Sequence, residues 1–244
     1  TNSASIQNAT LTGGAAAVDN HGEDSVMKDV TLTGSAITLT NEGTVENGTY
    51  TAETGAMTVK NSGKLSSGTY TAKAGTMDIT NEGTIENGTY TARGDLTYTD
   101  IAKSSLTDGT LISEEGKAKI TAHGVFRLKK LSAKDSATVE ADHDVTLTEA
   151  EAGTLAISSG GSVNAGTLTA KTGNASVTAK TDATIGTLKA EAGGATIEAT
   201  EGKLDVTTLN AKKHAALTSG GAMEVTKATV GSVAAKAATT SHVK

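Results

Sequence analysis

Residues 41–100 consist of three successive copies of one 20-residue block. The copies read NEGTVENGTYTAETGAMTVK, NSGKLSSGTYTAKAGTMDIT and NEGTIENGTYTARGDLTYTD. A repeat of this length is typical of solenoid proteins, in which each copy buries its apolar side only by stacking on the next copy. The sequence therefore predicts a stack of similar coils.

Each block contains three short runs of β-forming residues. In the first block these runs are residues 44–46, 49–52 and 56–59. They are separated by pairs such as Asn47-Gly48, which favour turns because both residue types tolerate backbone conformations that other residues avoid. Within each run apolar and polar residues alternate, so one side can face a core. We predict three short strands per coil.

Stacked coils would place equivalent side chains in columns. The predicted apolar columns are Val45, Leu65 and Ile85; Tyr50, Tyr70 and Tyr90; and Met57, Met77 and Leu96, and the predicted polar ladder is Asn41, Asn61 and Asn81. A sandwich of hairpins would also use short alternating strands, but it gives no reason for a fixed repeat. We therefore predict an all-β fold, a parallel β-helix with about 20 residues per coil.

The period extends beyond the clear copies. Ser5-Ile6 and Ser25-Val26 are spaced by 20 residues, and the core column continues through Leu111 to Leu131. Counting the later coils gives roughly twelve in total. No linker interrupts the pattern, so we predict a single domain over residues 1–244. Neither end carries a polar cap, which suggests an internal fragment of a longer chain.

The composition agrees with narrow coils. The chain has 28 glycines, no proline, cysteine or tryptophan, and only four tyrosines and one phenylalanine, so its core would consist of small and β-branched side chains. A net charge of −6 argues against nucleic-acid binding, which needs a basic surface. No apolar run is long enough for membrane insertion. We expect no cofactor and no metal site, because the five histidines lack metal-ligand spacing.

The later repeats resemble those of a known family. Residues 166–179 and 186–199 follow a G-T-L-x-A style that is similar to the repeat regions of filamentous-haemagglutinin-like exoproteins. The resemblance implies a segment of a bacterial adhesin, or of the stalk of a contact-dependent growth-inhibition effector. It also implies an outer-membrane secretion partner for the parent chain, a location outside the bacterial cell and a link to virulence. The family's secretion domain carries Asn-Pro motifs, and this proline-free chain cannot be that domain.

Arg93, Gly94 and Asp95 form the sharpest local motif. Integrins recognise this tripeptide through the guanidinium group and through the carboxylate, which binds a receptor metal ion. The motif replaces the corner that follows the tyrosine strand in the earlier blocks, so we expect it to be exposed. It is our candidate receptor-binding site, for an integrin-like host partner.

Two polar patterns have competing interpretations. Outward Thr-x-Thr pairs would form a flat array like that of ice-binding solenoids, although threonine is also simply a good outward strand residue; the pairs are clean in three coils, at Thr49, Thr51, Thr69, Thr71, Thr89 and Thr91. Glycosylation sequons occur at Asn8, Asn47, Asn87 and Asn174, where turn formation is the alternative explanation.

Catalysis has less support. Some polysaccharide lyases and hydrolases use parallel β-helices, and Asp142-His143-Asp144, with Glu140 and Glu149 nearby, is the nearest candidate for such a site. No second histidine or basic partner recurs at a stacked position, so a solvated corner explains the cluster better. We expect a rigid extracellular shaft without enzymatic activity, which either contributes to attachment or only spaces other parts of the parent chain.

Overall fold

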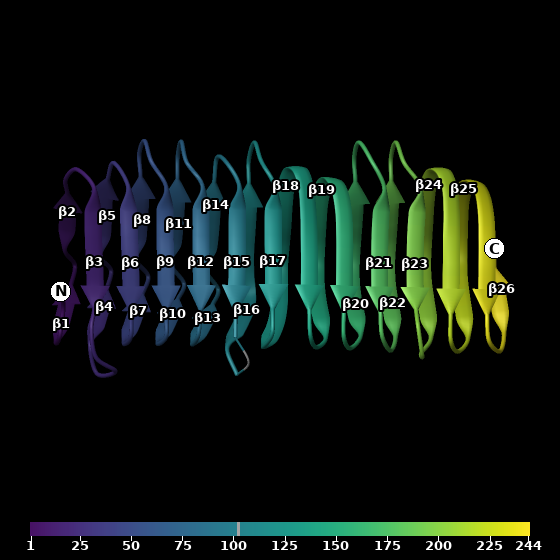
Figure 1. Cartoon of the computed structure of the whole chain (residues 1–244), viewed down its shortest axis with the longest axis horizontal. Coiled ribbons are helices and arrows are strands. Elements are labelled where there is room, and N and C mark those ends of the chain that lie inside the picture. The colour runs from purple at the N-terminus through teal and green to yellow at the C-terminus, as the bar shows by residue number, and fades with distance from the viewer. Residues whose placement is uncertain (102) are drawn as a thin grey trace. The chain divides into compact units, whose positions relative to one another are not determined.

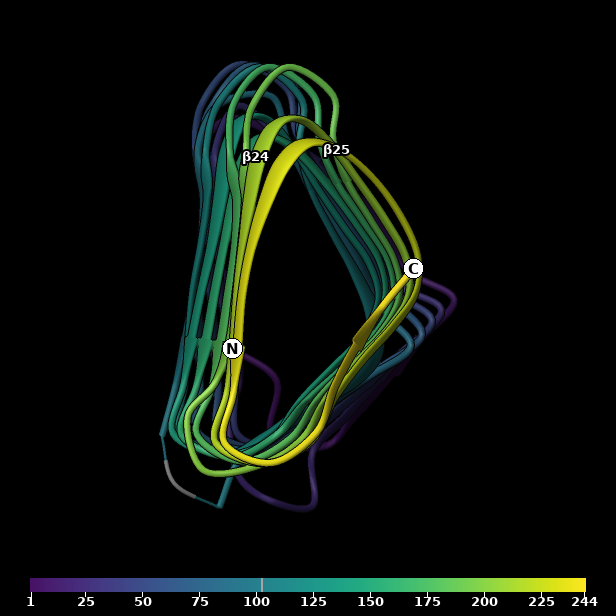
Figure 2. The same cartoon turned by 90° about the vertical axis from the view of Figure 1, so that its right-hand side faces the viewer.

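The computed structural model describes residues 1–101 and 103–244, and every regular element within them is a β-strand. Parallel pairing between successive coils confirms the predicted parallel β-solenoid, with about 12 turns, a spacing of roughly 20 residues and three strands per coil. Figure 2 looks along the stack and shows the three sides of the coils. No helix in the described part of the chain is long and apolar enough to cross a membrane.

The chain divides into two compact units, Thr1–Leu128 and Lys129–Lys244, and each is described by itself. The strands of the first unit are β1 (Ser5–Gln7), β2 (Thr10–Thr12), β3 (Ala16–Asn20), β4 (Val26–Lys28), β5 (Thr31–Gly34), β6 (Ile37–Asn41), β7 (Thr44–Glu46), β8 (Thr49–Ala52), β9 (Met57–Asn61), β10 (Lys64–Ser66), β11 (Thr69–Ala72), β12 (Met77–Asn81), β13 (Thr84–Glu86), β14 (Thr89–Ala92), β15 (Leu96–Asp100), β16 (Ser105–Ser113) and β17 (Ala118–Ala122). Strand β18 (Val125–Ala141) contributes residues to both units.

In the first unit, each strand pairs in parallel with the equivalent strands of the coils before and after it. Figure 1 shows one side of this unit, with β6, β9, β12 and β15 side by side. The repeat sets the register, because Leu65 lies between Val45 and Ile85 and all three are fully buried. Near the N-terminus the register differs from our alignment: Ile6 pairs with Met27, because the first coil is one residue longer than the 20-residue repeat.

Strands β8, β11 and β14 carry three of the four largest buried side chains. Tyr50, Tyr70 and Tyr90 are completely buried and stack in parallel planes, with ring centroids 5.1 Å apart in the first pair and 4.6 Å apart in the second. Gly48 shows why glycine precedes each tyrosine strand, since a Cβ atom there would lie 2.2 Å from the Tyr50 ring. The sequence suggested a conformational reason for this glycine, but the left-handed backbone belongs to Asn47, with φ of 52°.

The second unit has fewer sharp corners. Its strands are β19 (Val145–Ser159), β20 (Val163–Ala170), β21 (Ala175–Ala179), β22 (Ala183–Ala190), β23 (Ala195–Ala199), β24 (Leu204–Ser219), β25 (Met223–Ala237) and β26 (Ser241–Val243). Longer strands such as β19 pass from one side of the coil to the next, because β19 pairs with both β20 and β21. Small residues line much of this core, as in the buried column of Ala175, Ala195 and Ala215.

Candidate functional site

The tripeptide Arg93-Gly94-Asp95 forms the corner between β14 and β15. Three residues make this corner, whereas four residues, 53–56 and 73–76, make the equivalent corners of the two preceding coils. The side chains of Arg93 and Asp95 are exposed. The corner is therefore accessible, but it is tighter than its neighbours.

The backbone of this corner is bonded to the coils on both sides. The Arg93 amide donates to the Ala72 carbonyl at 2.9 Å, and the Gly94 amide donates to the Gly75 carbonyl at 3.0 Å. On the other side, the Ser113 hydroxyl donates to the Gly94 carbonyl at 2.8 Å. The tripeptide is thus held as part of the coil and does not form a free loop.

Both charged side chains of the tripeptide have partners on the next coil. An Arg93 Nη2 atom lies 3.1 Å from Glu115 Oε1, and this hydrogen bond raises the pKa of the guanidinium group. Asp95 Oδ1 accepts a 2.8 Å hydrogen bond from the backbone amide of Lys117. A receptor that uses these groups would have to compete with contacts inside the protein.

Two aspartates at a different corner of the coil, which precedes its first strand, make the same kind of contact in the second unit. Asp144 Oδ1 accepts from the Ser162 amide at 2.7 Å, and Asp182 Oδ1 accepts from the Lys203 amide at 2.7 Å. In each case a carboxylate at a corner binds the backbone of the following coil. A structural role therefore accounts for these aspartates without reference to a ligand.

The predicted acidic cluster lies at one of these corners. The amide of Ser162 stabilises the charged form of Asp144 and lowers the pKa of its carboxyl group. Glu149 on β19 pairs with Lys130 at 3.8 Å, and Glu140 is exposed. Among the described residues, no group of three or more His, Cys, Asp and Glu side chains could hold a metal ion.

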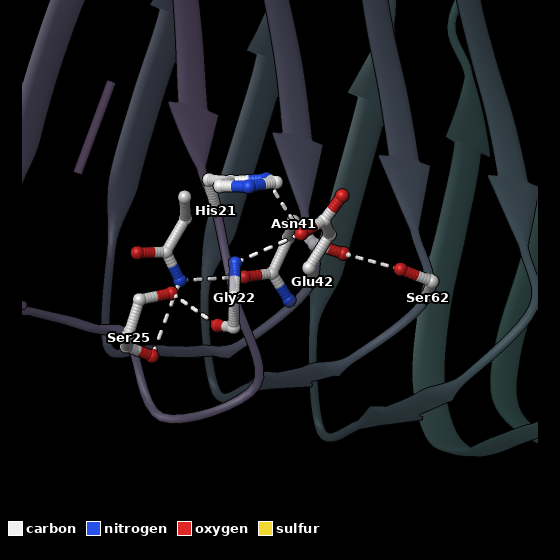
Figure 3. A network of polar contacts seen from close by, with 7 residues as sticks. His21, Gly22, Ser25, Asn41, Glu42 and Ser62 are labelled. Atoms are coloured by element: carbon white, nitrogen blue, oxygen red, sulfur yellow. Dashed lines mark hydrogen bonds and ion pairs between the residues drawn. The ribbon is translucent and has the colours of Figure 1, made fainter. Parts of the chain in front are cut away.

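A polar network that the sequence predicted only in part lies at the corner after the third strand of the early coils (Figure 3). Each asparagine amide nitrogen donates to the side-chain oxygen of the next: Asn2 to Asn20, Asn20 to Asn41 and Asn41 to Asn61 at 2.7 Å each, and Asn61 to Asn81 at 2.8 Å. The ladder therefore begins two coils before Asn41. All five asparagines are at most 7% exposed, so the hydrogen bonds between their side chains replace hydrogen bonds to water.

Outside this ladder, Glu42 joins neighbouring coils at the surface. Its Oε2 atom accepts from the Gly22 amide at 2.8 Å and lies 2.7 Å from His21 Nδ1 (Figure 3). Ser62 donates to the Asn41 carbonyl at 3.3 Å. These contacts connect coils and leave no converging set of reactive groups in the region drawn.

The outward threonines form a larger array than the sequence indicated. Strands β2 and β5 also carry Thr-x-Thr pairs, and they are in register with those of β8, β11 and β14. The array therefore covers five coils. The two early pairs surround a leucine, whereas the three later pairs surround a tyrosine. The spacing of all five pairs is visible in the sequence. The prediction counted only three coils because it considered only the pairs that surround a tyrosine.

The four sequons lie at corners. Asn8, Asn47 and Asn87 are exposed and have left-handed φ angles of 51°, 52° and 54°. Asn174 Oδ1 accepts from the Gly194 amide at 2.9 Å. The turn conformation explains the first three asparagines, and the hydrogen bond to the next coil explains Asn174; modification at all four stays a prediction.

No protein-family model matches the chain, no curated protein is significantly similar to it, and no solved structure matches it.

Proposed function

We propose that this chain is part of the rigid shaft of a bacterial adhesin-type exoprotein. In this proposal the chain works outside the cell, after export of the parent chain by an outer-membrane secretion partner. Its role is mechanical: it contributes to attachment by holding binding elements in place. The resemblance of the later repeats to filamentous-haemagglutinin-like proteins supports the cellular setting.

The observation that carries the mechanical role is the redundancy of contacts between coils. In the middle of the first unit each coil is joined to the next by parallel backbone pairing on all three sides. A hydrogen bond between asparagine side chains and a pair of stacked tyrosine rings join them as well. Exterior ion pairs such as Lys73–Glu53, at 2.9 Å, also join coils. A pulling force must break several of these contacts together to release one coil.

Single-molecule force spectroscopy tests this role. With handles at the two ends of the chain, we expect stepwise ruptures, each of which releases about 20 residues, or about 70 Å of extended chain. Extension at low force without steps would contradict the proposal. Labelling of intact producing cells by an antibody against the chain tests the location, and labelling only after cell lysis would contradict it.

Within this proposal, the Arg93–Asp95 corner is the candidate contact for a host receptor of the integrin type. Its exposed side chains support this role, whereas the contacts with Glu115 and Lys117 oppose it. Binding of the purified chain to integrin-bearing cells should fall with Asp95→Glu, which displaces the carboxylate. Asp182→Glu is the matched control, because it makes the same change at a corner that lacks the preceding Arg-Gly.

Equal loss in both variants would assign the effect to the corner structure and would contradict the receptor role. Unchanged binding by Asp95→Glu, or no binding by the unmodified chain, would do the same and leave the chain as a spacer.

A further inference from the structure

The outward side of the second strand in the first five coils carries threonine only. We call this surface the threonine face; it consists of Thr10, Thr12, Thr31, Thr33, Thr49, Thr51, Thr69, Thr71, Thr89 and Thr91. Each threonine pairs in register with the threonine of the next coil. The face ends at the sixth coil, where Ile112 lies beside Thr91.

The threonine face is a two-dimensional lattice. Parallel strands are spaced by about 4.8 Å, and residues two apart on one strand by about 6.6 Å. Each point of this lattice presents one hydroxyl and one methyl group. The surface is thus uncharged and periodic in two directions.

These spacings are close to those of ice. With an O–H···O distance of about 2.75 Å, tetrahedral geometry places second-neighbour oxygens about 4.5 Å apart and gives a layer repeat of about 7.3 Å. Across five coils the mismatch in the first direction accumulates to about 1.2 Å, which is less than half of one hydrogen-bond length. Two rows of threonines span only one repeat in the second direction.

In the last three coils of the face, buried side chains on the inner side of the strands keep the lattice in place. The rings of Tyr50, Tyr70 and Tyr90 stack on the buried side of the strands, beneath the threonine rows, with interplanar angles of 4° and 3°. The β-branched threonine side chain also has few accessible rotamers. The threonine side chains therefore lose little conformational entropy when water is ordered on the face.

Charged residues that border the face at the corner before the third strand form ion pairs. Lys73 pairs with Glu53 at 2.9 Å, and Arg93 pairs with Glu115 at 3.1 Å. By contrast, the side formed by β6, β9, β12 and β15 carries charges among its threonines, with Lys60 and Asp78 pointing outward. Of these two sides of the coils, the threonine face alone has a regular lattice that no charged side chain interrupts.

We propose that the threonine face binds ice, by ordering water whose oxygens match its lattice. This activity is independent of the shaft role and of the Arg93–Asp95 corner. It requires the surface of the folded first unit and no cofactor.

Thermal hysteresis and the shaping of ice crystals by the purified chain test the proposal. The unmodified chain should separate the freezing and melting temperatures and produce faceted crystals. Thr71→Tyr, in the fourth of the five coils of the face, should abolish most of the hysteresis, whereas Thr58→Tyr, which adds the same bulk to an outward threonine on β9, should retain it. Circular dichroism monitors the fold of both variants.

Thr71→Lys and Thr58→Lys form a second pair, in which a flexible side chain avoids steric clashes. Absence of hysteresis and shaping in the unmodified chain would overturn the proposal. Equal loss at positions 71 and 58 in folded variants would overturn it as well. Adsorption to an insoluble polysaccharide without any effect on ice would show that the face recognises another surface and would also refute ice binding.

Discussion

The side-chain amide of Asn81 donates a 3.2 Å hydrogen bond to the hydroxyl of Tyr98, and this contact ends the asparagine ladder. The hydroxyl in turn donates to Asp100 Oδ2 at 3.0 Å. Asp100 is fully buried and also accepts from the Gly124 amide at 3.2 Å. The aligned amides direct their N–H groups toward this carboxylate, as backbone amides do at an anion-binding helix end.

Tyr98→Phe should therefore destabilise the first unit. The substitution removes one donor to Asp100 and one acceptor from Asn81, while both groups keep other partners, and the loss of such a hydrogen bond costs about 0.5–1.5 kcal/mol. Urea denaturation measures the change in the free energy of unfolding, and hydrogen exchange should locate it near β15. An unchanged free energy would mean that the hydroxyl is not needed to satisfy either group.

Tyr70→Phe, unlike Tyr98→Phe, should not lower the stability of the first unit. The Tyr70 hydroxyl is buried and has no hydrogen-bond partner in the described structure, and burial raises its pKa well above the usual value. Removing an unpaired buried hydroxyl should leave stability unchanged or raise it by up to about 1–3 kcal/mol. Denaturation of Tyr70→Phe alongside Tyr98→Phe gives a direct comparison, and a clear loss in the former would reveal a partner for the hydroxyl.

Tyr70→Asp should unfold several coils. It would place an unpaired charge at a fully buried position between two stacked rings, and burial of such a charge costs several kcal/mol. Thr71→Asp, on the outward side of the same strand, is the control. A thermal midpoint that stayed the same in Tyr70→Asp would contradict the inward orientation of this column.

Asn61→Ala should interrupt the ladder at its centre. The substitution leaves the Asn41 amide and the Asn81 oxygen without their ladder partner, at a cost of about 1–3 kcal/mol. Hydrogen exchange should show faster opening of the coils that contain these residues. Lys60→Ala, at the adjacent exposed position, should have little effect; an equal effect would show that the ladder does not stabilise the stack.

Asp144→Asn should weaken the dependence of stability on acid pH. The pKa of Asp144 is lowered in the folded chain, so its stabilisation is present above the unfolded pKa, near 3.8, and is lost as pH falls through the folded value. We expect a shallower loss of stability below pH ~4 in the variant than in the unmodified chain. Asp205→Asn, on the outward side of β24, is the control, and an identical acid profile in Asp144→Asn and the unmodified chain would contradict the linkage.

The repeat predicted the middle of the first unit well. Where apolar residues recur every 20 positions, as at Val45, Leu65 and Ile85, parallel stacking allows only one register that buries them all. The first coil was harder, because an extra residue there shifted Ile6 from the position assigned to it. Val26 and Met27 are adjacent and both apolar, so either could align with Ile6 and the short alignment did not reveal the shift.

Contacts between different residue types were not predictable in the same way. Asp100 and Tyr98 break the repeat, and the sequence does not indicate that these two exceptions satisfy each other. The partner of Arg93 is likewise set by the tight corner that brings Glu115 beside it. Repetition reveals columns of like residues, whereas pairs of unlike residues depend on corner geometry.

The one-directional amide ladder also makes the number of coils adjustable. Asn61 both receives a hydrogen bond from the coil before it and donates one to the coil after it, so each middle coil joins its neighbours through the same pair of contacts. Loss of residues 61–80 would bring Asn41 against Asn81 and preserve every column, and duplication of the same segment would extend it. Descendants of such a gene can change length by whole repeats while the chemistry that joins neighbouring coils stays the same.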